Sequence, residues 1–150
     1  MHPSIEIPRK IALAYDIVCK PLCRQLNLPQ TAFDILMFLG NNPAYKTASE
    51  IVELRHIKAN LVSVNVERLV REGYLLRRPV PNDRRKTELL CSEKAQPVIR
   101  RGQQLQNDFF RCLFDGADEE TRRAFSSALG TLEKNLDLFL AERSHLCTSR

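Results

Sequence analysis

Residues 58–86 read KANLVSVNVERLVREGYLLRRPVPNDRRK, and this stretch decides the fold. In its first half, apolar residues recur at positions i, i+4, i+7 and i+8, which form one stripe along a helix of 3.6 residues per turn. Gly73 follows this pattern, and glycine is favoured where a helix ends in a left-handed residue. The sequence therefore predicts a helix over about Lys58 to Glu72. Its core-facing stripe consists of Val62, Val66, Leu69 and Val70.

The second half of the stretch predicts a basic β-hairpin over about Arg77 to Leu90. Two arginines precede a proline-bounded tip, PVPND at 79–83, and a strand-like segment follows at 87–91. Three basic residues stand directly after the tip. A helix followed by a hairpin with a basic tip is typical of a winged helix. The basic residues beside the tip are Arg77, Arg78, Arg84, Arg85 and Lys86.

Positive charge is concentrated in the same segment. Between Arg55 and Lys86, nine basic residues stand against three acidic ones, a net charge of +6 in a chain whose total is +5. Such a concentration is typical of proteins that contact phosphates, because each neutralised phosphate releases condensed counterions. A basic face that is merely solvated gives the same pattern, so charge alone does not decide between the two.

The composition excludes several classes of protein. At 150 residues, 43% hydrophobic and 27% charged, the chain fits one globular domain. No apolar run approaches the roughly 18 residues that span a bilayer, and the first residues lack a secretion signal, so we expect a cytoplasmic protein without membrane contact. The five cysteines form no CxxC pair and the three histidines are far apart, so neither a disulfide framework, a metal site nor a cofactor is predicted. Motifs of common enzymes such as GxSxG and HExxH are missing, and we predict no catalytic residues and no enzyme.

Helical patterns precede the central stretch. A helix over 11–26 contains Pro21, which we expect to kink or break it near Cys19. A second helix has Pro29 in its first turn. Thr47-Ala48-Ser49-Glu50 has the form of a capping box and opens a short third helix. Together with the central helix it predicts a helix-turn-helix, which presents its second helix to the major groove.

Two helices are expected after the hairpin. Ser92 is suited to cap a long helix that reaches Leu113, and Asp118 to cap the last one. Apolar residues in the last helix step by 4, 3, 4 and 3 positions, which is a heptad-like seam. Such a seam packs on another helix of the same subunit or on a second copy, and the spacing leaves both open. The seam consists of Phe125, Leu129, Leu132, Leu136 and Phe139.

The order of these elements resembles the MarR (multiple antibiotic resistance regulator) family of bacterial winged-helix transcription factors. Four motifs carry the resemblance, and the last is the most specific: LPQTAF at 28–33, TASEI at 47–51, VERLVREGYL at 66–75 and PNDRRK at 81–86. It implies a mainly α fold with a small β-hairpin wing, organised as a single domain. It also implies a winged helix-turn-helix lobe over about 28–91, dimerisation helices over 1–27 and 92–143, and a tail over 144–150.

The resemblance implies a function as well. A homodimer would bind a pseudo-palindromic operator in double-stranded DNA, with the recognition helix in the major groove and the wing in the minor groove, under control of a small aromatic or phenolic effector. By position, Asp83 and Arg85 match the wing acid of the family and the arginine that it orients. A guanidinium at a hairpin tip is suited to the narrow minor groove, and Arg84 and Lys86 beside it to phosphates.

We expect further DNA contacts from the two helices of the helix-turn-helix. Asn60 is suited to adenine and Val64 to a thymine methyl group. Many relatives carry Thr-Arg where Ser63-Val64 stands, so a different operator is expected here. At the start of the third helix, hydroxyl groups either contact phosphate or only cap the helix. The expected contacts on these helices are Thr47, Ser49, Lys58, Asn60, Ser63, Val64 and Arg68.

Other readings stay open. Cys19 and Cys23 share one helix face and are candidates for redox sensing, although small buried thiols are commoner and no cysteine matches the sensing position of the peroxide-sensing relatives. Effector contact and plain core packing are alternatives for Tyr15, Phe33, Met37 and Phe109. As a whole, the protein is alternatively a thiol-based redox regulator, or an interaction module whose basic hairpin docks an acidic protein.

Overall fold

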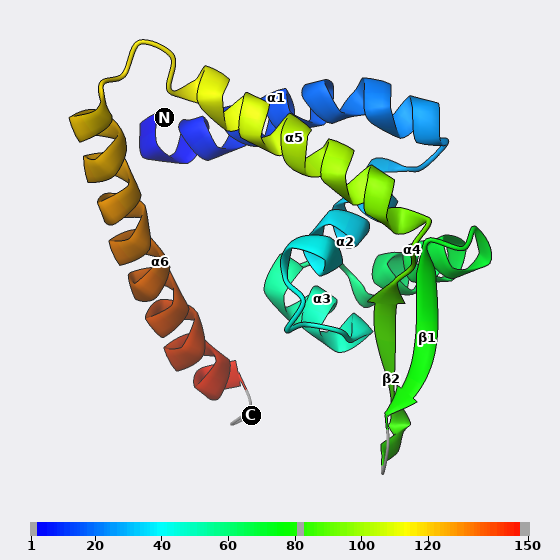
Figure 1. Ribbon diagram of the computed structural model, residues 1–150. Coiled ribbons are helices and arrows are strands. Elements are labelled where there is room, and N and C mark those ends of the chain that lie inside the picture. Colours follow the sequence, from blue (N-terminus) through cyan, green and yellow to red (C-terminus); the bar gives the residue numbers. More distant parts are fainter. Residues whose placement is uncertain (1–2, 81–82, 148–150) are drawn as a thin grey trace. The chain divides into compact units, whose positions relative to one another are not determined.

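The computed structural model describes residues 3–80 and 83–147 and forms two compact units, residues 1–109 and 110–150. It is mainly helical with one two-stranded antiparallel hairpin, which confirms the predicted fold class (Figure 1). In the part of the chain that the structure describes, no helix is long and apolar enough to cross a membrane. The elements are α1 (Pro3–Leu26), α2 (Gln30–Asn41), α3 (Ala48–Arg55), α4 (Ala59–Arg71), β1 (Leu75–Val80), β2 (Asp83–Cys91), α5 (Ala95–Leu113) and α6 (Glu119–Cys147).

The central helix is α4, and it has the amphipathic form that the sequence predicts. Lys58 and Glu72 are its caps, so the predicted bounds are confirmed. Val62, Val66 and Leu69 are buried, and α4 is in contact with α2 and α3. Gly73 has a φ of 79°, the left-handed conformation expected after the last turn.

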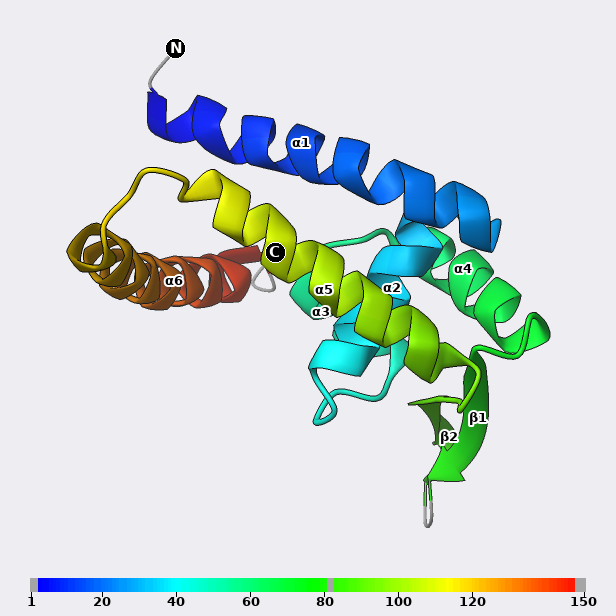
Figure 2. The ribbon, with the colours of Figure 1, turned by 45° about the horizontal axis from the view of Figure 1, so that its top comes forward.

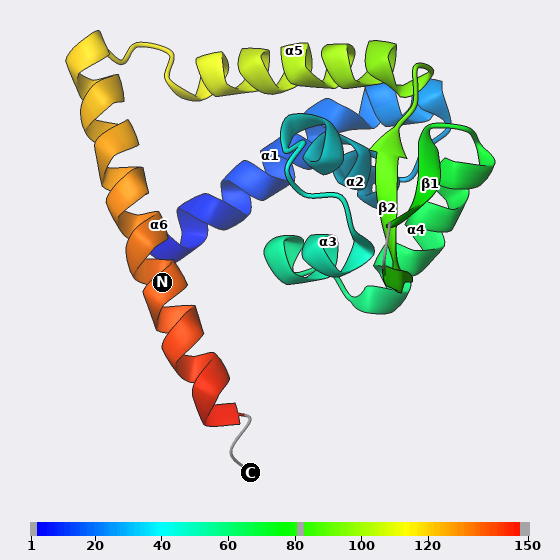
Figure 3. The same ribbon diagram turned by 60° about the horizontal axis from the view of Figure 1, so that its bottom comes forward.

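The hairpin follows α4 directly, and Figure 3 shows it beside the pair α3 and α4. Its register runs from Leu75 opposite Cys91 to Val80 opposite Asp83, with an irregularity between Pro79 and Val80. The hairpin is also joined to the loop before α3, because the Leu89 amide donates to the Lys46 carbonyl at 2.6 Å. The wing is therefore held from two sides, by α4 at its base and by this loop along β2.

The caps predicted for the short helix α3 and for the last helix, α6, are both present. Thr47 forms the capping box with Glu50 at the start of α3. Asp118 accepts the Thr121 amide at 2.8 Å before α6, and hydrogen bonds from the Thr121 side chain and from this amide lower the pKa of the Asp118 carboxyl. Pro29 is the N-cap of α2 rather than a residue of its first turn.

The sequence predicted a kink or a break near Pro21; the break is wrong, and a kink stays a prediction. α1 runs without interruption from Pro3 to Leu26, with Pro8 and Pro21 inside it (Figure 2). Proline at 21 removes one amide donor, and the carbonyl left without it belongs to Ile17, an exposed residue that water can reach. Cys19 and Leu22, on either side of the proline, are buried in the core and fix the helix there.

The predicted tail also begins too early. α6 continues to Cys147, so residues 144–147 are helical, and residues 148–150 lie outside the described part. No glycine or proline stands between residues 144 and 147 to stop the helix.

Helices α2 and α5 approach each other closely at two glycines. A Cβ on Gly40 would lie 2.8 Å from Ile99 Cγ2, and one on Gly102 would meet Met37 Sδ and Phe33 Cζ. Ile99, Met37 and Phe33 are all buried. The two helices therefore pack side chain against bare backbone at these positions.

We expect Gly40→Ala to destabilise the fold by about 1–3 kcal/mol, because the added methyl group overlaps the buried, β-branched Ile99. Alanine by itself would favour the helix by roughly 1 kcal/mol. The matched control is Gly130→Ala in α6, where nothing lies within 4 Å of the added Cβ. Denaturant unfolding should show lower stability for the first variant and equal or higher stability for the second, and equal gains in both would contradict the close approach.

Candidate nucleic-acid interface

The exposed side of α4 presents a short polar and apolar face. Asn60, Ser63 and Val64 are exposed, and Lys58 is exposed at the N-cap. Asn60, Ser63 and Val64 therefore lie on the first two turns of the helix, away from the buried stripe, whereas Lys58 precedes the helix on the side of Val62. Such a face has the size and the mixed chemistry that base edges in a major groove require.

Helix α3 precedes α4 in the chain, and Thr47 is its N-cap. The Thr47 hydroxyl group already makes hydrogen bonds with Glu50. Thr47 Oγ1 accepts the Glu50 amide at 3.3 Å and is 2.9 Å from Glu50 Oε2, to which it donates. The Lys46 amide donates to the same carboxylate at 2.7 Å, and these hydrogen bonds lower the pKa of the Glu50 carboxyl. The capping role of Thr47 is confirmed, whereas a phosphate contact by Thr47 or by the exposed Ser49 stays a prediction.

Two ion pairs fix the wing. Arg77 Nη2 donates to Glu67 Oε2 on α4 at 2.8 Å, which joins the base of the hairpin to the recognition helix. Arg78 Nη2 donates to Glu88 Oε2 on the opposite strand at 2.6 Å and lowers the pKa of that carboxyl. The sequence placed both arginines in one basic patch, and the structure shows that each has an acidic partner.

The tip of the wing is only partly described. Pro81 and Asn82 lie outside the described residues, and Arg84 and Arg85 are described only as backbone of β2. The predicted orientation of Arg85 by Asp83 is therefore untested. Lys86 is exposed, with its ammonium 4.0 Å from the Asp83 carboxylate.

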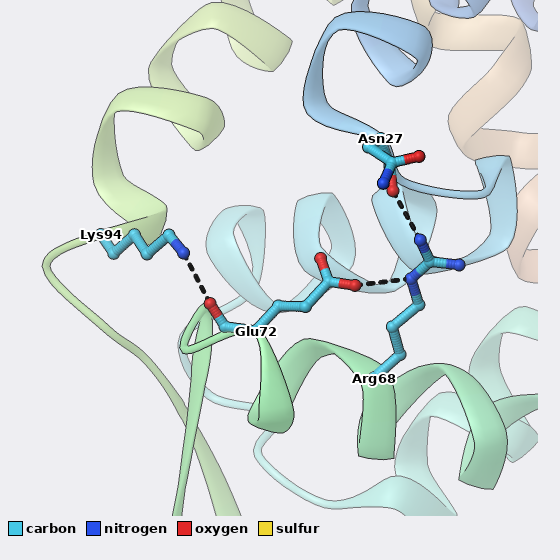
Figure 4. A network of polar contacts seen from close by, with 4 residues as sticks. All are labelled: Asn27, Arg68, Glu72 and Lys94. Carbon is cyan, nitrogen blue, oxygen red and sulfur yellow. Dashed lines mark hydrogen bonds and ion pairs between the residues drawn. The ribbon is translucent and has the colours of Figure 1, made fainter.

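Arg68 has a different environment from the one that the sequence suggested (Figure 4). Its Nε donates to Glu72 Oε1 at 2.8 Å, and its Nη2 donates to the Asn27 carbonyl at 2.6 Å. Asn27 is the left-handed residue, φ 52°, directly after α1. The guanidinium thus joins the recognition helix to the turn between α1 and α2, and a DNA contact by Arg68 stays a prediction.

The network of Figure 4 continues to the first residues before α5. Lys94 Nζ donates to the Glu72 carbonyl at 2.7 Å, where the last turn of α4 leaves acceptors unpaired. The same ammonium lies 4.7 Å from the centre of the Tyr74 ring, a cation–π contact. Neither Lys94 nor the pair Arg77 and Glu67 was singled out from the sequence, because each joins elements whose distance only the fold defines.

Residues 26–86, from the end of α1 into the wing, match the model of the MarR family. This segment of the chain is therefore similar to the MarR family of transcriptional regulators.

Individual MarR relatives are similar over most of their length. The HTH-type transcriptional regulator PecS of Dickeya dadantii (strain 3937) is 25% identical over 129 residues, which cover 85% of this chain and 78% of PecS. A MarR family regulator from Listeria monocytogenes, crystallised with a 26-mer DNA, superposes with a TM-score of 0.80 at 19% identity over 91% of this chain and 90% of that one. A MarR regulator from Methanosarcina mazei Go1 superposes with a TM-score of 0.75 at 18% identity, over 87% of this chain and 93% of that one. These structures show that the fold is that of the MarR winged helix.

The predicted effector residues lie in the packed interior. Phe33 and Met37 are buried against Gly102 of α5. Phe109 is buried too and meets the Tyr15 ring edge to face, with 5.5 Å between the centroids. The Tyr15 hydroxyl accepts from Gln106 Nε2 at 2.8 Å, and burial raises its pKa. In this structure the four side chains pack against other side chains instead of lining a pocket. Their contact with an effector stays a prediction.

The two candidate redox cysteines are buried in the same core. Burial raises the pKa of the Cys19 thiol, and it raises that of Cys23 to about 11. Cys23 Sγ donates to Gln30 Oε1 at 3.5 Å. Reactive cysteines are thiolates that solvent reaches, so this environment favours the structural role for both residues.

We expect Arg68→Ala to lower the free energy of unfolding by about 1–2 kcal/mol, because it removes hydrogen bonds from a charged, largely covered guanidinium. Arg71→Ala is the matched control, one arginine further along the same helix and exposed. Thermal or denaturant unfolding should leave this control within about 0.5 kcal/mol of wild type. Equal effects of the two substitutions would show that the contact with Asn27 adds no stability.

Proposed function

We propose that this protein is a bacterial, cytoplasmic regulator that binds a pseudo-palindromic operator in double-stranded DNA as a homodimer. The observation that carries the proposal is the exposed face of α4 next to a hairpin with a basic tip, in a chain whose residues 26–86 match the model of the MarR family. The Listeria regulator that was crystallised with DNA supports this proposal, because its structure matches 91% of this chain. In the complex, α4 would enter the major groove and the wing would reach the minor groove.

Exposed apolar side chains support the homodimer. The seam predicted in α6 is 44–58% exposed in the single chain. α1 exposes large aliphatic side chains of its own, among them Ile7, Leu13 and Ile17. Terminal helices with such surface suit a symmetric, self-complementary interface between two copies. A two-fold dimer also explains why the operator would be pseudo-palindromic, because each half-site meets one α4.

A small aromatic or phenolic effector would act by a population shift. A ligand that prefers a dimer whose two recognition helices have the wrong spacing lowers DNA affinity by its differential affinity for that state. Phe33 and Met37 are buried here, so an effector that contacts them would have to bind a state in which the core beside α5 opens. Titration of operator complexes with candidate phenols tests this part, and binding without any change in operator affinity would refute it.

Selection of duplexes from a random DNA pool tests the proposal itself. We expect enrichment of a two-fold symmetric site, with one homodimer bound per duplex by light scattering. Anisotropy titrations of that site and of scrambled DNA at two salt concentrations should show specific binding that weakens steeply with salt. A pool that stays without enrichment, together with salt-insensitive binding, would refute the DNA-binding proposal and favour an acidic protein as the partner of the hairpin.

Arg85→Ala should weaken operator binding by about 1–3 kcal/mol if the guanidinium reaches a base edge in the minor groove. Lys86→Ala, at the next residue, is the matched comparison. As a phosphate contact it should weaken specific and scrambled DNA alike and reduce the salt slope by about one. Anisotropy titrations separate the two patterns. Unchanged operator affinity in the first variant would refute the role of Arg85.

A further inference from the structure

Two apolar side chains are exposed side by side on the recognition helix. Leu61 is 46% exposed and Val64 is 66% exposed, while Val62 between them is buried. Positions three apart on a helix are neighbours on its surface, so the two side chains form one apolar strip. Asn60 and Ser63, both exposed, border this strip. Leu61 was not among the contacts expected from the sequence.

Between Ala59 and Glu67 this face lacks the side chains that read guanine, and the lysine before it, Lys58, lies at the N-cap outside the apolar strip. From Ala59 to Glu67 the helix reads ANLVSVNVE, without lysine or arginine. The commonest contact to guanine is a bidentate arginine or lysine in the major groove. The first arginine further along is Arg68, whose guanidinium donates to Asn27 and Glu72. The helix therefore offers methyl groups and amides to base edges where a cation would be needed for guanine.

The one charge in this segment has a partner from the wing. Glu67 is exposed, and Arg77 Nη2 donates to its carboxylate at 2.8 Å. Without this partner, a carboxylate beside a groove would be repelled by the phosphates on both sides. The ion pair makes this end of the face nearly neutral, so the apolar strip can approach the bases.

We propose that α4 recognises thymine methyl groups in an A·T-rich part of each half-site, through Leu61 and Val64. In the major groove only thymine presents a methyl group, on C5, and apolar side chains are its natural partners. Asn60, on the border of the strip, is suited to the adenine of the same base pairs, since amides pair with adenine N6 and N7. The proposal rests on the proposed function and names the kind of DNA sequence that this site prefers.

The test uses the full-length protein and the operator obtained by selection. Each thymine of one half-site is replaced singly by deoxyuridine, which keeps every hydrogen-bonding group and lacks only the C5 methyl group. We expect binding about fourfold weaker for each methyl group contacted, the effect of one buried methyl-sized group. Anisotropy titration of each duplex measures this ratio of uracil to thymine affinity at each position.

Two variants assign the effect to side chains. Leu61→Ala and Val64→Ala should each remove the uracil effect at one position, because the methyl group there loses its partner. Leu76→Ala is the matched control, since Leu76 is 55% exposed but lies on β1. It should leave every ratio at its wild-type value. Thermal unfolding of the three variants confirms that each is folded before titration.

The outcomes are distinguishable. An operator that binds tightly, yet equally well with uracil at every position, would overturn the inference and leave the proposed function intact. Uracil effects that persist in both α4 variants would overturn it as well, because another side chain would then contact the methyl groups. Failure to select any operator would refute the proposed function, and the inference with it.

Discussion

Burial of one side of α4 is the constraint on which the rest of this structure depends. Val62, Val66 and Leu69 are withdrawn from water, α4 contacts α2 and α3, and each large aliphatic side chain so buried contributes about 1.5–3 kcal/mol. A helix fixed by one stripe has only one rotation about its axis that keeps the stripe buried. The opposite side of α4 is then exposed. Core packing does not constrain its side chains, so they can be suited to contacts with DNA. The same residues that stabilise the lobe thus determine which residues can read a base sequence.

The buried stripe does not fix the position of α4 along the helix axis. Polar contacts at the ends of α4 define that position. Arg68 and Glu72 join the helix to the turn after α1, and Lys94 donates to the Glu72 carbonyl at its end. Glu67 joins it to the wing through Arg77. Exposed ion pairs contribute little to stability, so the pair with Arg77 matters more for the relative position of helix and hairpin. Recognition helix, wing and the end of α1 consequently form one connected unit within residues 1–109.

Local patterns in the sequence were sufficient for most of the fold. The stripe and Gly73 define α4, the capping box defines the start of α3, and Asp118 defines the start of α6, because each signal is contained within one turn. Contacts between distant residues were not predictable in this way. Nothing local shows that Arg68 meets a carbonyl 41 residues earlier in the chain, and nothing local shows that Gly40 faces Ile99. Pro21 misled for the same reason, since burial of its neighbours in the core outweighs one missing hydrogen bond. At the candidate site, helical periodicity predicted which residues of α4 are exposed. The roles predicted for the wing tip rest only on the PNDRRK motif at 81–86.

The hydrogen bond between Arg68 and Asn27 links α4 to the end of a long helix. With 24 residues, α1 is about 36 Å long, and its last turn is tied to the recognition helix through the Asn27 carbonyl. Arg68 thus connects the recognition helix to a helix whose first residues lie about 36 Å from that contact.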